Sequence, residues 1–221
     1  TALPNRLLQE PVWQQIRNFT THWQEPTSPL YANVDNIWLE FDVDGNSDRS
    51  PIPSCFFGSQ TITAAASTVP DPHAWVTQTA IQLLRDRAIS PAIEQHLFGC
   101  FAALPNGVHV FQVGLMLARQ SDVVRICLRG ISPDQIIDYL SQIGWLGSTD
   151  ALATLLTELS THVERIDLDL DVGEAGVAAK IGLECYLTVQ PKYEPRWTSF
   201  LDYLVEIGLC LPQKQAALLT Y

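Results

Sequence analysis

The sequence predicts an α+β fold in which repeated αββα units form an antiparallel barrel or part-barrel with helices outside. Three observations predict it: helices that open on X-Pro, strands with one apolar and one charged face, and an internal repeat. Ser132 and Gln135 add the pattern of a capping box. Proline suits a first helical turn, and it follows a helix-start residue at Glu10-Pro11, Asp71-Pro72, Ser132-Pro133 and Glu194-Pro195.

The internal repeat joins two of these helices. The tetrapeptide Ile-Asp-Tyr-Leu at 137–140 recurs as Leu-Asp-Tyr-Leu at 201–204, an offset of 64 residues. Ile143-Gly144 recurs as Ile207-Gly208 at the same offset, where a glycine is expected to end each helix. A constant register favours duplication over coincidence.

Period-2 alternation identifies the strands. In residues 37–44, Ile37, Leu39, Phe41 and Val43 alternate with Trp38 and acidic residues. The same pattern recurs at 124–129, where apolar residues alternate with Arg125, Cys127 and Arg129, and at 165–172, where they alternate with Arg165 and three aspartates. We expect the apolar faces to lie under the helices and the other faces to meet water or a lumen.

These signals give one order of elements along the chain. Three units, at about 11–104, 91–160 and 149–221, share helix pairs within a single domain, and the opening of a fourth leads us to expect a longer native chain. The expected helices are 11–23, 72–88, 91–104, 133–143, 149–160, 195–207 and 212–221, with hairpins at 36–58, 108–129 and 164–189.

Composition limits the partners and the compartment. A net charge of −11 argues against nucleic acid and anionic membranes, both of which attract clustered Lys and Arg. No apolar run is long enough to cross a membrane. Five cysteines without C-x-x-C spacing favour reduced thiols, so we expect a cytoplasmic protein.

Known motifs of metal and nucleotide sites are missing from the sequence. The five histidines lack zinc-site spacing, and no phosphate-binding loop, dinucleotide fingerprint or nucleophile elbow is present. The segment 42–48 has oxygen donors around Gly45, yet Pro53 stands where an EF-hand needs its bidentate acid. A hairpin turn explains this segment better, and the sequence predicts no metal site.

The polar strand faces carry the candidates for chemistry. A solvated sheet face or a network of lumen salt bridges would equally explain each residue taken alone. Lys180, Gly182, Glu184 and Tyr186 share one face by parity. The candidates are the acids Glu40, Asp42, Asp167, Asp169 and Glu184, the cations Arg125, Arg129 and Lys180, and the aromatic Tyr186.

The helix-hairpin-helix succession resembles the αββα (ABBA) barrel of soluble aromatic prenyltransferases. The segment 38–42 is similar to the strand in which the indole-type enzymes place a carboxylate that accepts the N–H of the aromatic substrate, a role that falls here on Glu40. The segment 180–187, followed by Pro191, is similar to strands whose Lys and Tyr line the barrel. The chain departs from that pattern at Glu184, where the family usually has a cation.

The resemblance implies transfer of a prenyl group from an allylic diphosphate to an aromatic or peptide acceptor. Glu40 and Tyr186 would be catalytic, with Tyr186 stabilising the allylic cation. Arg125, Arg129 and Lys180 would hold the diphosphate, with Mg²⁺ as a bridging ion if one is needed. Asp42, Asp169 and Glu184 would complete the substrate-binding face.

The acidic excess supports a second hypothesis. A non-catalytic barrel would bind a cationic peptide or small molecule on these strand faces, as an adaptor in a biosynthetic assembly. A third hypothesis, a homodimer, pairs exposed sheet edges across a twofold axis.

Overall fold

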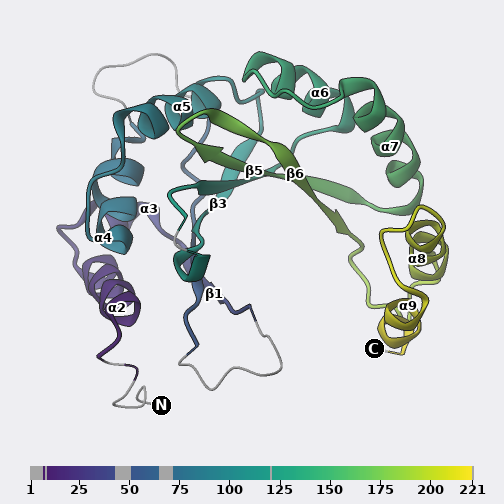
Figure 1. The fold of residues 1–221 in the computed structure, drawn as a ribbon, viewed down its shortest axis with the longest axis horizontal. Helices are drawn as coiled ribbons and strands as arrows, with labels where there is room; N and C mark the ends of the chain where they lie inside the picture. Colours follow the sequence, from purple (N-terminus) through teal and green to yellow (C-terminus); the bar gives the residue numbers. More distant parts are fainter. Residues whose placement is uncertain (1–6, 8, 43–50, 65–71, 120, 221) are drawn as a thin grey trace.

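The protein is an open, curved antiparallel sheet whose outer face is covered by an arc of helices (Figure 1). The computed structural model describes residues 7, 9–42, 51–64, 72–119 and 121–220. Each strand pairs with its neighbour in the sequence, in the order β1 to β6. The strands are β1 (Asn36–Glu40), β2 (Ser54–Gly58), β3 (His109–Leu115), β4 (Val124–Arg129), β5 (Arg165–Gly173) and β6 (Gly176–Tyr186).

Helices and hairpins alternate in the predicted order. The helix expected at 72–88 is shorter than predicted: it opens as a π-helix and ends at Arg85, because Asp86 adopts a left-handed conformation with φ of 54°. The short helix α3 was not expected. The helices are α2 (Pro11–Gln24), α3 (Pro29–Asn33), η1 (Val76–Ile81), α4 (Gln82–Arg85), α5 (Pro91–Ala102), α6 (Pro133–Gln142), α7 (Thr149–His162), α8 (Arg196–Glu206) and α9 (Pro212–Leu219).

The predicted helix starts are largely confirmed. Pro11 and Pro133 each occupy the first turn of their helix, and Ser132 and Gln135 form the capping box. Pro195 precedes the first residue of α8, and the backbone N–H of Arg196 donates to the carboxylate of Glu194. Asp71 lies outside the described residues.

The 64-residue repeat has a structural counterpart at the ends of α6 and α8. Gly144 and Gly208 adopt left-handed φ values of 73° and 75°. The next residues donate backward in the same way, Trp145 to the carbonyl of Leu140 and Leu209 to that of Leu204. Both helices therefore end in the same glycine-dependent turn.

The predicted apolar strand faces form the core of the central strands. Ile126 in β4 and Leu168 and Leu170 in β5 are fully buried beneath the helices. β1 is different, because Leu39 and Phe41 are 38% and 39% exposed. β1 also ends at Glu40, so its predicted apolar face is mostly uncovered, and residues 43 and 44 lie outside the described part.

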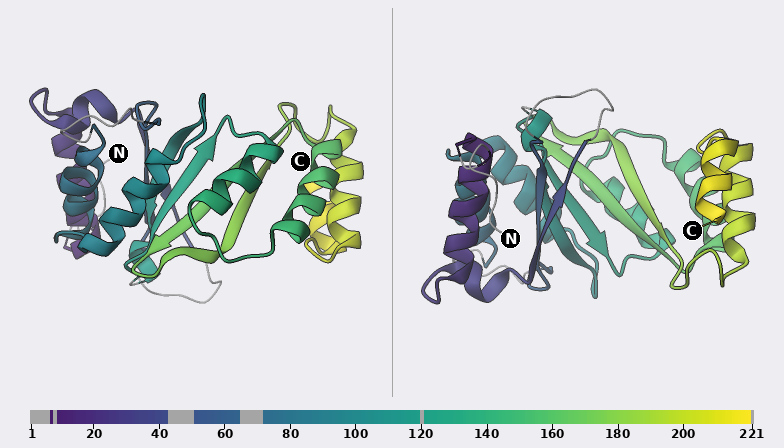
Figure 2. Two further views of the ribbon diagram at one scale, coloured as in Figure 1. Left: turned by 90° about the horizontal axis from the view of Figure 1, so that it is seen from above. Right: turned by 90° about the horizontal axis from the view of Figure 1, so that it is seen from below.

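The sheet does not close into a barrel in the described part of the chain. Its order begins at β1 and ends at β6, and no described strand pairs with the outer edge of either. The views from above and below place the helices over one face and leave the strands open on the other (Figure 2). The structure therefore has a helix-covered convex face and an uncovered concave face.

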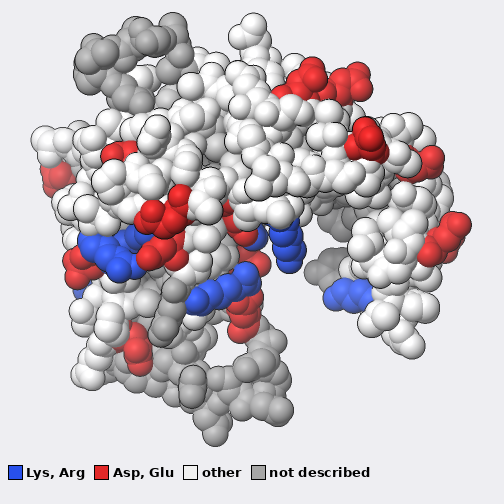
Figure 3. Space-filling model, turned by 45° about the horizontal axis from the view of Figure 1, so that its top comes forward, with Lys and Arg blue, Asp and Glu red and all other residues white. Residues whose placement is uncertain are grey.

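On the outer surface, the middle helices carry acids but no Lys or Arg. Residues 131–162, which include α6 and α7, contain no Lys or Arg, and acidic side chains dot this part of the surface (Figure 3). Among the described residues, no helix has the length and apolar character needed to cross a membrane.

Candidate functional site

Two neighbouring cavities lie on the concave face of the sheet. The first has a volume of about 530 Å³ and the second about 340 Å³. They share three lining residues, Trp38, Gln112 and Glu184, which come from β1, β3 and β6. The two cavities therefore form parts of one surface that runs across the sheet.

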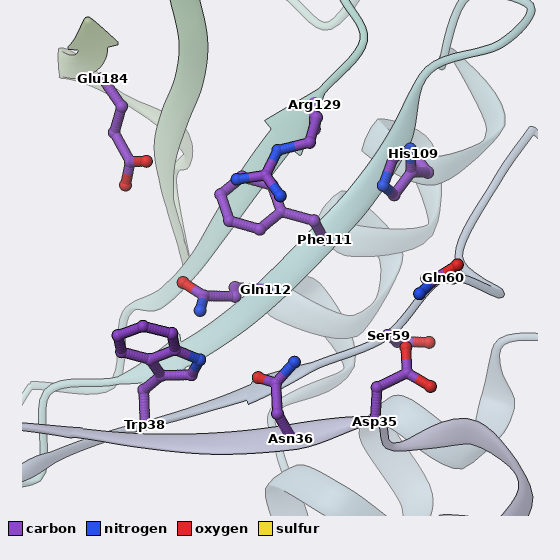
Figure 4. Close-up of a pocket in the computed structure, with 10 residues that line it drawn as sticks. All are labelled: Asp35, Asn36, Trp38, Ser59, Gln60, His109, Phe111, Gln112, Arg129 and Glu184. Atoms are coloured by element: carbon purple, nitrogen blue, oxygen red, sulfur yellow. The ribbon is translucent and has the colours of Figure 1, made fainter. Parts of the chain in front are cut away.

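The first cavity is lined by side chains from both ends of the sheet. Trp38 rises from β1 on one side, whereas Glu184 reaches in from β6 on the other (Figure 4). Between them, Phe111 carries Arg129 over its ring. The remaining lining residues are polar and come from β1 and the residue before it, from β3 and from the segment after β2: Asp35, Asn36, Ser59, Gln60, His109 and Gln112.

An apolar strip crosses the concave face, which the sequence predicted to be polar. Phe56, Met116 and Cys127 are buried together, with Phe111 packed against them. Gly114 makes room for the Phe56 ring, since a Cβ at position 114 would lie 2.2 Å from it. The adjacent Phe56 and Phe57 were the available signal, because neighbouring strand residues face opposite sides.

Arg125 is held by a carboxylate of the neighbouring strand. Its Nε and Nη2 donate to the two carboxylate oxygens of Asp171, over 2.8 and 3.0 Å. The hydrogen bond to Asp171 is the main reason that the pKa of Arg125 is raised. This predicted diphosphate ligand therefore has its guanidinium fork occupied.

Asp167 binds two arginines at one end of the concave face. It is 1% exposed, and its carboxylate contacts Arg129 Nε at 3.0 Å and Arg165 Nε at 2.9 Å. Arg129 lies 3.8 Å over the ring of Phe111, and Arg165 lies 4.1 Å over that of Tyr186. One face of the predicted cation-stabilising Tyr186 is thus covered by Arg165, which was not among the predicted site residues.

Asp169 lies between these pairs and has no arginine of its own. It faces Cys127 across β4 and Gly182 across β6, and its Oδ1 is buried without a hydrogen-bond partner in the described structure. One ligand atom from each of Cys127, Asp169 and Glu184 lies within 4.8 Å of the other two. The three residues are far apart in sequence, and only the pairing of β4, β5 and β6 brings them together.

Electrostatics at this cluster disfavour negative charge. Burial raises the pKa of Asp169 despite the opposing effects of Cys127 and Arg125. Burial, then the nearby charge of Asp169, raises the pKa of Glu184. The Cys127 thiol has its pKa raised strongly, first by burial and then by Asp169. A positive ion at this position would lower all three pKa values, because it favours the charged form of each acid.

The other predicted residues have different positions. Glu40 lines the second cavity. Asp42 receives two hydrogen bonds from Arg119, at 2.8 and 2.9 Å, which lower its pKa, and it lines neither concave-face cavity. Lys180 is exposed on β6 and also lines neither of them. Most of the calcium-loop candidate, residues 43–48, lies outside the described residues.

Comparison with protein-family models, with curated proteins and with solved structures gave no match. The chemistry of the concave face must therefore be argued from its own residues. Its second cavity combines three carboxylates, an arginine that is already paired, an exposed indole and a buried thiol.

Proposed function

We propose that the concave face binds a small cationic ligand, or a cationic side chain of a peptide, beside Trp38. The observation that carries this proposal is that the acids around the second cavity have no ion-pair partner in the described structure, whereas its arginine has one. Glu40, Asp169 and Glu184 line it with no ion pair to any of them in the described structure. Arg125, the cation on the same wall, is committed to Asp171.

Trp38 supplies the second half of the recognition. Its side chain is 62% exposed although it borders both cavities. An ammonium or guanidinium group is attracted to the face of an indole, and adjacent carboxylates strengthen its binding. An aromatic ring next to unpaired acids thus suits a ligand with an apolar body and a positive group.

Calorimetric titration with tryptamine, an aromatic primary amine, tests the proposal. We expect binding that weakens as ionic strength rises, because charge attraction contributes to it. Trp38→Leu and Glu184→Gln should each weaken binding about tenfold, the loss of roughly 1.4 kcal/mol. Glu158→Gln, at an exposed acid of α7, is the matched control and should leave binding unchanged. Equal losses in the control and the site variants, or no binding heat, would refute the proposal.

Prenyl transfer is the second candidate, and the order of elements supports it. Each hairpin is preceded and followed by helices on the convex side, as in αββα units, and Glu40 lies on the concave wall as the resemblance implies. The arginines would have to leave their aspartates to bind a diphosphate. Titration with dimethylallyl diphosphate and Mg²⁺ tests this: binding lost in Arg129→Ala supports transfer, and no binding heat rejects it.

A further inference from the structure

We propose that Cys127, Asp169 and Glu184 form a binding site for a divalent transition-metal ion such as Zn²⁺ or Co²⁺. The three residues come from three consecutive strands and line the second cavity on the concave face. The proposal rests on the proposed function in one respect, that this cavity accepts positive charge. It differs from the proposed function because the ligand is a metal ion and Trp38 takes no part in holding it.

The register of the strands explains why the donors converge. Cys127 and Asp169 are direct partners across β4 and β5. The residue opposite Asp169 on β6 is Gly182, so no side chain separates its carboxylate from Glu184, two residues further along. A Cβ at position 182 would lie 3.0 Å from the Asp169 Cβ and 3.1 Å from its Oδ2. The missing side chain at Gly182 thus lets Asp169 lie against β6.

An independent observation points to a ligand at this position. Asp169 is partly buried and hydrogen-bonded to Cys127, but its Oδ1 atom is shielded from solvent and has no hydrogen-bond partner in the described structure. Buried polar atoms are nearly always satisfied, so an orphaned carboxylate oxygen beside two further donors calls for a partner. A metal ion would satisfy it together with the thiolate and the second carboxylate.

The donor set selects the class of metal. A thiolate favours borderline or soft ions, whereas Mg²⁺ and Ca²⁺ prefer all-oxygen sites. Zn²⁺ and Co²⁺ accept a sulfur and two carboxylate oxygens in a four-coordinate arrangement. On binding, the Cys127 thiol gives up its proton to solvent and its sulfur lone pair to the metal. Three protein donors leave one position for water or a ligand from the second cavity.

Cobalt titration of the chelator-treated full chain tests the site. Co²⁺ bound to a thiolate gives a charge-transfer band in the near ultraviolet, and we expect it to saturate at one equivalent and to disappear on addition of Zn²⁺. Cys127→Ala should abolish the band. Asp169→Asn and Glu184→Gln should keep the sulfur donor but weaken Co²⁺ binding at least tenfold.

Cys185 provides the matched control. It follows Glu184 on β6 but packs toward the helices, so Cys185→Ala should retain the band. The absence of a thiolate band in the unaltered protein, or a band lost in Cys185→Ala and kept in Cys127→Ala, would overturn the proposal. Circular dichroism identifies any variant that does not fold. If Cys127→Ala is one of these, the weakening in Asp169→Asn decides the question.

Failure of the metal site can be separated from failure of the proposed function. Trp38→Leu should weaken tryptamine binding and leave the cobalt band intact. A cobalt band without tryptamine binding would keep the metal site and reject organic-cation recognition. Tryptamine binding without a cobalt band would do the reverse.

Discussion

Asp167 and Asp169 are two residues apart on the same face of β5, yet they have opposite surroundings. Asp167 is shared by two arginines, Arg129 from β4 and Arg165 from β5 itself. Each aspartate has a buried Oδ1 without a hydrogen-bond partner in the described structure, but Asp167 Oδ1 lies 2.9 Å from Arg165 Nε. No described ion pair includes Asp169, and a second carboxylate lies nearby. A row of aspartates on one strand can thus contain both a structural ion pair and a ligand site. The neighbouring strands decide which is which.

The largest expected effect follows from removing the shared carboxylate. Asp167→Asn should lower the free energy of unfolding by about 3 kcal/mol, because two guanidinium groups lose a buried partner. This loss is at the low end for a buried ion pair, because the Arg129 and Arg165 side chains are 38% and 35% exposed. Urea denaturation measures it.

Asp171→Asn is the matched control for that change. Asp171 is 26% exposed and binds a single arginine, so we expect a loss of only about 1 kcal/mol. Similar losses of unfolding free energy in the two variants would show that a second arginine adds no stability at Asp167.

Asp169→Asn should not lower the free energy of unfolding of the metal-free protein, in contrast to Asp167→Asn. The substitution removes the charge of a partly buried carboxylate with one unsatisfied oxygen, so the free energy of unfolding should stay constant or rise by up to about 1 kcal/mol. The same denaturation measurement applies. A loss as large as that expected for Asp167→Asn would mean that Asp169 has a structural role and would contradict the comparison.

Gly182→Ala sharpens the comparison with a smaller change. The new methyl group would lie 3.0 Å from Asp169 Cβ and 3.1 Å from its Oδ2, so Asp169 would have to shift, at a cost of about 1 kcal/mol. Its displacement should weaken Co²⁺ binding about tenfold, as measured by the cobalt band. Gly173→Ala, whose Cβ would meet only Val123 at 3.5 Å, should leave the band unchanged. Equal effects of the two substitutions would count against placement of Asp169 by Gly182.

The smallest effect is expected at Arg196. Its arrangement is the inverse of that at Asp167, because one cation lies between two carboxylates. Its side chain donates to Glu164 and Glu194, and hydrogen bonding to Arg196 lowers the pKa of Glu194 to about 2. Because the pKa of Glu194 is lower in the folded than in the unfolded protein, its ionised form stabilises the fold at pH values above 4.5. This stabilisation is lost as the pH falls from 4.5 to about 2.

Arg196→Ala should therefore raise the pKa of Glu194 toward its ordinary value, measured by carboxyl NMR titration. The backbone N–H of residue 196 still donates to Glu194, so a partial return is expected. An unchanged pKa would show that the arginine has no part in the shift.

Local patterns in the sequence predicted most helices and strands, but they did not predict that the sheet stays open. Alternation placed Ile166, Leu168 and Leu170 on the buried face of β5 correctly, because period 2 is a property of the strand itself. It failed at β1, where Leu39 and Phe41 remain exposed because no described helix covers them fully. The short helix α3 and the open sheet were also missed.

The candidate site divides in the same way. Parity correctly put Glu40, Asp169 and Glu184 on one face, and the sequence also named Arg125 and Arg129 as anion ligands. Strand pairing places each arginine against an aspartate of β5, so neither guanidinium is free to bind an anion as predicted. Parity also put Cys127 on the face of Arg125 and Arg129, but only the pairing of β4 with β5 shows that it lies beside Asp169.

The sequence by itself determined the order of helices and hairpins, the capping box, the glycine-terminated helices and the acidic excess, because each depends on neighbouring residues or on composition. The tertiary structure alone decided which charges are neutralised and which remain for a ligand. That outcome depends on register across strands: a shift of one residue would turn Asp169 away from Cys127 and toward the core.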